Sequence, residues 1–126
     1  MMQKNTINNI GLALLRIIPS ALMLVHGIPK FQKLINGDFG KMDPIGIGAA
    51  PSLFLAVIGE VVCPLLLIVG FKTRLAAIPA AITMAVAAFI VHGKDPLATK
   101  ELALLYFVFF IVIALLGPGK YSIDRK

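Results

Sequence analysis

Five polar side chains that could do chemistry lie within or beside long apolar stretches of the sequence: Arg16, His26, Glu60, His92 and Glu101. A charged side chain near the centre of a bilayer costs about 2.5–3.5 kcal/mol on insertion scales, so such residues usually face a partner, a ligand or water. Imidazoles and carboxylates can also take up and release protons when their surroundings shift their pKa. We therefore predict that these residues form a ligand-binding or proton-linked site. The sequence identifies no catalytic residue.

Arg16 and Glu60 are predicted to form an ion pair in the middle of the membrane. Asn9 and Gly70 lie near the limits of the two apolar runs. At a helical rise of 1.5 Å per residue, Arg16 lies roughly 10 Å past Asn9 and Glu60 lies roughly 15 Å before Gly70. Pairing would compensate two charges that each carry an insertion cost. The pair would either fix the register of two helices or belong to a site for a polar ligand or a proton, and both interpretations stay open.

His26 and His92 are predicted to lie at one depth, near the outer surface. His26 follows Arg16 by about 15 Å and His92 follows Arg74 by about 27 Å along their helices. A stripe of small residues below His92 would turn it into the bundle: Ala77, Ala81, Ala85 and Ala88. With Glu101, the histidines would suit a divalent metal such as zinc, a hydrogen bond to a quinone, or a proton relay. In the simplest alternative each histidine only bonds neighbouring backbone.

Composition places these residues in a membrane protein. Of 126 residues, 59% are hydrophobic and only 14% are charged, against about 45–50% apolar and about 25% charged in average soluble domains. A water-soluble fold could not cover so many apolar side chains, and a disordered chain would contain fewer. The net charge of +6 comes from Lys and Arg between the apolar runs, which favours anionic lipid as a partner and excludes nucleic acid. The single cysteine, Cys63, is predicted to be a packing residue.

We expect an all-α fold, an integral membrane four-helix bundle with antiparallel up-down connectivity. The predicted spans cover residues 8–28, 51–71, 74–92 and 98–117, each close to the roughly 20 residues that a helix needs to cross a bilayer. Residues 1–126 are expected to form a single domain whose first helix is retained rather than cleaved as a signal peptide. The connection between the first two helices is predicted to begin at residue 29 with an amphipathic segment on the outer membrane face.

Basic residues give the predicted orientation. The side that carries both termini and the 72–74 turn has six Lys and Arg residues, and the opposite side has five. The short basic turn between the second and third helices favours the cytoplasm for that side. We therefore predict that both termini are cytoplasmic.

Three motifs accompany these helices. His26-Gly27-Ile28-Pro29-Lys30 fits H-G-x-x-K, Gly70-Phe71-Lys72-Thr73-Arg74 fits G-x-x-T-R, and the segment 117–124 fits G-P-G-x-x-S-x-D. In their order and spacing they resemble the DoxX family of small four-helix bacterial membrane proteins. Arg16, Glu60 and His92 also fall where that family carries polar intramembrane residues. The resemblance implies a multi-pass protein of the bacterial inner membrane.

One stretch departs from the family pattern. Relatives often have small glycines after the glutamate of the second helix, whereas this chain has Val61-Val62-Cys63-Pro64. Pro64 is predicted to kink the helix and to free a backbone carbonyl near Glu60.

The resemblance implies fold more sharply than chemistry. The first hypothesis is an accessory subunit, rather than a self-contained enzyme, of a membrane redox system linked to quinones or to thiol and oxidative stress. It would bind a quinone as its cofactor and a soluble or membrane oxidoreductase as its partner, alone or as a homodimer. The alternatives are a small transporter or proton- or ion-coupled carrier, and a structural or assembly protein. A quinone bound between the helices would favour the accessory subunit. A cavity that joins Glu60 to one surface would favour the carrier, and a closed bundle would favour the structural protein.

Overall fold

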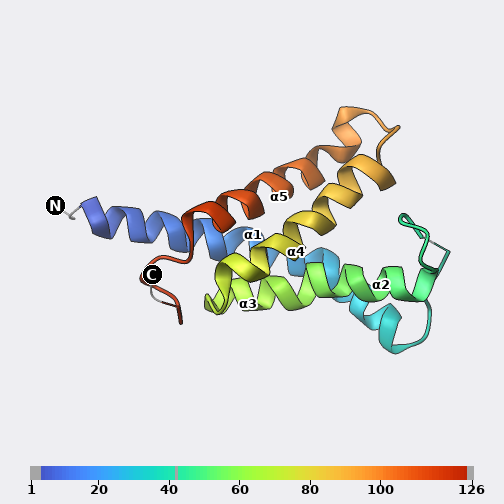
Figure 1. The fold of residues 1–126 in the computed structure, drawn as a ribbon, viewed down its shortest axis with the longest axis horizontal. Coiled ribbons are helices and arrows are strands. Elements are labelled where there is room, and N and C mark those ends of the chain that lie inside the picture. Colours follow the sequence, from blue (N-terminus) through green and yellow to red (C-terminus); the bar gives the residue numbers. More distant parts are fainter. Residues whose placement is uncertain (1–3, 42, 125–126) are drawn as a thin grey trace.

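The computed structural model describes residues 4–41 and 43–124, and these residues form helices and no strand (Figure 1). In chain order the helices are α1 (Lys4–Ile35), α2 (Ala49–Val57), η1 (Ile58–Val62), α3 (Cys63–Val69), α4 (Thr73–Val86), η2 (Ala87–Val91) and α5 (Leu97–Leu116). Because η1 and η2 are π-helical turns within longer helices, the chain builds four rods: α1, α2–η1–α3, α4–η2 and α5. Both ends of the chain lie at the end of the bundle that holds the turn between α3 and α4 (Figure 1).

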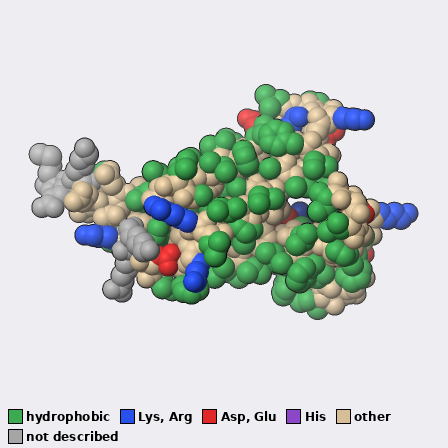
Figure 2. Space-filling model, in the orientation of Figure 1, with side chains coloured by type: hydrophobic (Ala, Val, Ile, Leu, Met, Phe, Trp, Pro, Cys, Tyr) green, Lys and Arg blue, Asp and Glu red, His purple; other side chains and the backbone are tan. Residues whose placement is uncertain are grey.

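All four rods are long and apolar enough to cross a membrane, with lengths of 19 to 31 residues. Apolar side chains cover much of the molecular surface, and Lys and Arg side chains gather toward its ends (Figure 2). Large apolar residues such as Leu22, Phe54 and Ile82 are more than half exposed, an arrangement that is stable only when lipid surrounds them. The expected four-helix membrane bundle is therefore confirmed.

The first helix is longer than predicted. Residues 29–35, expected to leave the first span as a separate amphipathic segment, instead continue α1 to Ile35. Pro19 and Pro29 both lie inside α1, and membrane helices tolerate proline because neighbouring groups satisfy the freed backbone. At 1.5 Å per residue the 32 residues of α1 extend over roughly 48 Å, more than the hydrocarbon thickness of a bilayer.

Two widened helical turns interrupt the rods. Pro64 has no N–H to donate to the carbonyl of Glu60, four residues earlier. Just before it, the Cys63 N–H bonds to Ile58 O, five residues earlier, as in a π-helix. The predicted disturbance near Glu60 is thus a π-helical turn. In η2 the His92 N–H bonds to Ala87 O at 2.9 Å. Such turns often accompany functional sites, and one contains Glu60 while the other ends at His92.

The chain after α5 folds back over the end of α3. Its Ile123 and Asp124 N–H groups donate to Val69 O and Gly70 O at 3.1 and 2.9 Å. Gly70, at φ 73°, takes the left-handed conformation that ends α3, which glycine adopts without steric cost. The tail segment 117–124 therefore joins the turn between α3 and α4.

The same tail also caps the next helix. The Asp124 carboxylate accepts the N–H groups of Lys72 and Thr73 at 3.1 and 2.9 Å. A carboxylate at a helix N-terminus satisfies unpaired donors and interacts favourably with the helix dipole. The G-x-x-T-R turn and the tail motif are consequently parts of one structural unit.

Packing at the bundle centre depends on small residues of α4. Ala77, Ala81 and Ala88 are buried, as the predicted stripe requires, while Ala85 is half-buried. α4 packs most extensively against α5, whose Phe110 and Ile113 are buried. Cys63 is also buried and unpaired within this core, as expected for a packing residue.

Candidate functional site

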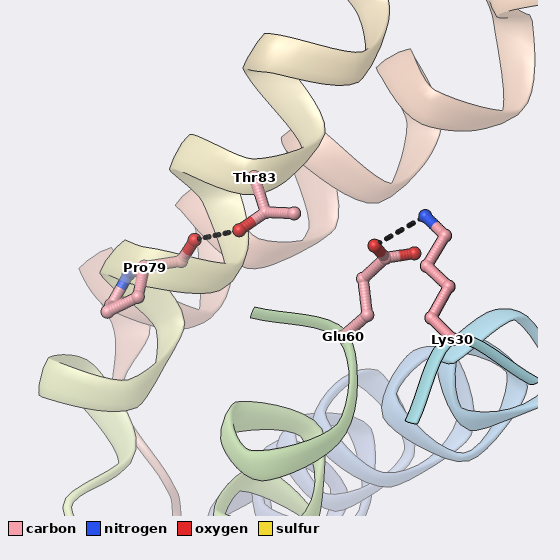
Figure 3. Close-up of polar contacts among 4 residues, drawn as sticks. All are labelled: Lys30, Glu60, Pro79 and Thr83. Atoms are coloured by element: carbon pink, nitrogen blue, oxygen red, sulfur yellow. Dashed lines mark hydrogen bonds and ion pairs between the residues drawn. The ribbon is translucent and has the colours of Figure 1, made fainter. Parts of the chain in front are cut away.

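An ion pair joins the loop-side part of α1 to the middle of the α2–η1–α3 rod. The loop side is the end of the bundle that holds the α1–α2 loop and the turn between η2 and α5. Lys30 Nζ donates to Glu60 Oε2 at 2.7 Å, and the two side chains point toward each other (Figure 3). Glu60 is 3% exposed, whereas the Lys30 side chain is 43% exposed. A charge-assisted bond of this length is strong because burial lowers the local dielectric. The pair is one buried acid held by a cation that can still be reached.

Gly27 allows the backbones around this pair to approach. A Cβ atom at position 27 would lie 2.3 Å from the Glu60 carbonyl oxygen and 2.8 Å from its carbonyl carbon. No real Cβ comes so close to backbone, so only glycine fits here. Gly27 therefore seats α1 against the carbonyl to which Pro64 cannot donate, and it brings Lys30 into reach of Glu60.

The predicted Arg16–Glu60 ion pair is wrong. Arg16, 1% exposed, donates to Leu67 O at 2.8 Å and Ile68 O at 2.7 Å, and also to Tyr121 O. α1 and the α2–η1–α3 rod run antiparallel, so Arg16 lies level with Leu67, while Glu60 lies two turns earlier, roughly 10 Å away along the axis. The last carbonyls of α3 and the tail carbonyl accept from its two terminal nitrogens instead, while the buried Arg16 Nε has no hydrogen-bond partner among the described residues.

A first cavity extends from the ion pair between the loop-side ends of α2 and α4. Its volume is about 200 Å³, and besides Lys30 and Glu60 its lining is almost wholly apolar, with Ser52 and Thr83 as the exceptions. The Thr83 hydroxyl donates to Pro79 O at 2.9 Å (Figure 3), so its hydrogen is already engaged. Figure 2 shows the surface hollowed between these helix ends. The cavity thus offers an apolar enclosure with one charged end.

The loop between α1 and α2 forms one wall of this cavity, through Phe39, Pro44 and Ile45. Asp43 fixes the loop, because its carboxylate accepts the N–H groups of Ile47 and Gly48 and the hydroxyl of Ser52, each at 2.9 Å. These hydrogen bonds hold the pKa of Asp43 below its usual value, and the bond from the Gly48 N–H has the largest effect.

A second cavity, of about 270 Å³, lies on the other side of the ion pair between α1, α4 and α5. Its lining includes His26, His92 and Tyr106. The His26 ring meets the Tyr106 ring edge-on at 6.0 Å between centroids, and His92 Nδ1 donates to Asp95 Oδ2 at 2.8 Å. The structure therefore brings both predicted histidines to one cavity, together with Glu60.

Glu101 does not join them. It is exposed at the start of α5 and does not line the second cavity. Among the residues that the structure describes, no three His, Cys, Asp or Glu side chains lie close enough to share a metal ion. The proposed His26–His92–Glu101 metal set is therefore wrong. Glu101 lies one turn into α5, on the face opposite the one that packs into the bundle, so its carboxylate is exposed.

Two roles in this region were missed from the sequence. Lys30 belongs to the H-G-x-x-K motif, but it was placed in the outer segment that was expected to begin at residue 29. Tyr106 was not among the predicted site residues, yet it is buried beside His26 and lines the second cavity. The spacing of Gly27 and Lys30 to one side of α1 was the signal that could have found the Lys30–Glu60 pair.

The part of the chain that builds this site matches a known family. The sequence model of the DoxX family matches residues 11–93, which include His26, Lys30, Glu60 and His92. The chain belongs to the DoxX family. No solved structure matches this DoxX chain significantly.

Three relatives match this DoxX protein over most of its length. An uncharacterized protein of Haemophilus influenzae is 36% identical over 122 residues, covering 91% of this chain and 89% of that one. An uncharacterized membrane protein of Mycobacterium tuberculosis is 29% identical over 130 residues, covering 89% and 78%. A Bacillus subtilis protein named "Putative oxidoreductase CatD" is 30% identical over 116 residues, covering 91% and 85%.

Proposed function

We propose that this DoxX protein is an accessory subunit of a membrane redox system and binds a quinone-like ligand in its first cavity. The observation that carries the proposal is an apolar enclosure of about 200 Å³ that ends at the Lys30–Glu60 pair. Ligand sites are typically apolar pockets with a few placed polar groups. A quinone combines an apolar ring and tail with carbonyl oxygens, to which the Lys30 ammonium can donate.

The residues suit binding better than self-contained catalysis. Cys63 is buried and is the one cysteine in the sequence, so dithiol chemistry needs a second protein. The Bacillus subtilis relative is named as an oxidoreductase, which supports a role beside an oxidoreductase, soluble or in the membrane. The partner would supply the electrons, and this chain would hold the ligand and orient it.

The proposal is tested by equilibrium dialysis of a short-chain quinone against the detergent-solubilised protein. Lys30→Met should weaken binding by roughly tenfold or more, because a charged hydrogen bond contributes about 1.5–3 kcal/mol and about 1.4 kcal/mol is tenfold. Lys33→Met is the matched control, since Lys33 lies on the same part of α1 but is exposed and lines neither cavity. Native mass spectrometry of the same preparation identifies molecules that co-purify.

Two results would refute the quinone proposal. One is a wild-type protein that binds no quinone above the empty detergent micelle. The other is a Lys30→Met variant that binds as well as Lys33→Met. Because Lys30→Met leaves Glu60 without a cation, the double variant Lys30→Met with Glu60→Leu provides a site free of unpaired charge, and it should bind as weakly as the single variant.

A proton-coupled carrier is the second candidate, favoured by the two cavities that meet at one buried carboxylate. A proton-coupled carrier needs an ionisable group inside the bundle, and Glu60 is such a group with a cavity on each side of it. Liposomes with a trapped pH-sensitive dye test this candidate. A carrier would dissipate a proton gradient in wild type and fail to do so in Glu60→Gln.

We further propose the cytoplasmic orientation of both termini in the bacterial inner membrane. The six basic residues on the terminal side support it. Cysteine variants Lys41→Cys and Lys120→Cys, in a Cys63→Ala background, should react from opposite sides of the membrane with a thiol reagent that cannot cross it. Labelling of both positions from one side would contradict the proposed topology.

A further inference from the structure

The Lys30–Glu60 pair separates two cavities of different character. Lys30, Glu60 and Ala87 are the residues that line both. The first cavity is apolar and is walled by the α1–α2 loop, α2 and α4. The second lies between α1, α4 and α5, and polar side chains from α1, from η1, from the residue after η2 and from α5 make up about half of its lining. One buried carboxylate is thus in reach of an apolar space and of a polar one.

The second cavity is suited to hold water. At about 270 Å³ it exceeds by far the 10–15 Å³ that one water molecule needs. Its titratable lining consists of His26 and Lys30 from α1, Glu60 from η1, His92 after η2 and Tyr106 from α5. Waters there would find several polar partners, as buried waters require.

The same cavity reaches the loop-side surface. His92, which lines it, is half-buried and bonds to the exposed Asp95 in the turn 92–96. Thr99, another lining residue, is exposed at the start of α5. The mouth of the second cavity is therefore lined by polar side chains that can hydrogen-bond to water.

We propose that the second cavity is an aqueous route by which Glu60 exchanges a proton with the loop-side surface, while the first cavity takes the ligand. In the exchange, water of the second cavity delivers one proton to the Glu60 carboxylate, and the Lys30–Glu60 hydrogen bond breaks. The Lys30 ammonium keeps its protons and is then free to donate to an oxygen atom in the first cavity. Only the role of the first cavity rests on the proposed function.

Two alanines allow each cavity to be filled separately. Ala103 on α5 lines only the second cavity, and Ala56 on α2 lines only the first. Ala103→Phe should block the aqueous route, and Ala56→Phe should block the ligand space, each without altering a charged group. Size-exclusion chromatography and helical circular dichroism check that both variants fold.

A water-soluble carbodiimide measures access to the carboxylate, because it reacts with protonated carboxyl groups. The chain has two glutamates, Glu60 and the exposed Glu101, so Glu101 serves as the internal reference in peptide mapping. Ala103→Phe should slow modification of Glu60 by about tenfold or more, since a closely packed side chain leaves no gap the size of water. Ala56→Phe should leave that rate close to wild type. Modification of Glu101 should be equal in all three proteins.

An unchanged Glu60 rate in Ala103→Phe, or equal slowing in Ala56→Phe, would overturn the proposed route. Quinone dialysis on the same variants should show the reverse pattern, with binding lost in Ala56→Phe and kept in Ala103→Phe. If the carbodiimide pattern holds while no variant binds quinone, the route stands and the quinone function fails. If a phenylalanine variant does not fold, Ala103→Cys and Ala56→Cys, in a Cys63→Ala background, are blocked after purification with a bulky thiol reagent and judged by the same criteria.

Discussion

Arg16 offers the sharpest test of how this fold is held together. Arg16→Met keeps most of the side-chain volume but removes the donors to the carbonyls of Leu67, Ile68 and Tyr121. Leu67 O retains a bond from the Gly70 N–H at 3.2 Å, so two carbonyls lose their partner. Each lost partner costs about 1–3 kcal/mol of stability. Part of this cost is recovered because the Arg16→Met variant no longer buries a charge. We expect a net loss of roughly 2–4 kcal/mol in the free energy of unfolding.

Unfolding by SDS in mixed micelles, followed by circular dichroism, measures this loss. Lys120→Met is the matched control, because Lys120 lies at the same end of the bundle with an exposed side chain, and it should change stability by less than about 0.5 kcal/mol. Carboxypeptidase should also digest the tail faster in Arg16→Met, since the Tyr121 carbonyl has lost its donor. If Arg16→Met is as stable as Lys120→Met, the guanidinium does not hold α3 and the tail together, and the reasoning is refuted.

Three further predictions concern other parts of the fold. Gly27→Ala should destabilise the protein by about 1–3 kcal/mol or more, because its new Cβ overpacks against Glu60. Gly11→Ala, with nothing within 4 Å of its new Cβ, should stabilise the protein by about 0.5–1 kcal/mol. Equal SDS midpoints for the two variants would contradict this prediction. Asp124→Ala should cost about 0.5–2 kcal/mol as a lost helix cap, and Asp124→Asn less, in the same SDS assay. Because the pKa of Asp43 is lowered in the fold, its loop bonds are complete above the usual value of 3.8 and are lost as the pH falls through the lowered value. Protection of loop amides from hydrogen exchange should fall in that range in wild type and stay independent of pH in Asp43→Asn.

The membrane fold could be predicted because hydropathy alone defines it. Four apolar runs of the length of a bilayer leave no other backbone arrangement, and the four rods confirm them. The end of the first helix was placed too early, at residue 28, where the apolar run ends, whereas α1 continues to Ile35. Hydropathy marks where a span leaves the apolar layer, but the helix itself continues beyond that point, through Pro29.

The partners of the charged residues could not be predicted from depth alone. Counting residues from the ends of apolar runs gives a depth only when the helix limits are known, and α1 begins before Asn9 and extends past His26. Arg16 donates to backbone carbonyls, and these carry no mark in the sequence because every residue has one. Glu60 was correctly identified as a buried acid that needs a cation, and only the identity of that cation was wrong.

The fold-back of the tail has a consequence for biogenesis. Segment 117–124 follows α5 in the chain, so the ribosome makes it after all four helices have been synthesised. Until then Arg16 lacks the Tyr121 carbonyl and α4 lacks the Asp124 cap. The bundle is therefore completed by a polar segment that comes after the last helix, and premature termination within the tail would leave four helices without the bonds that close this end of the bundle.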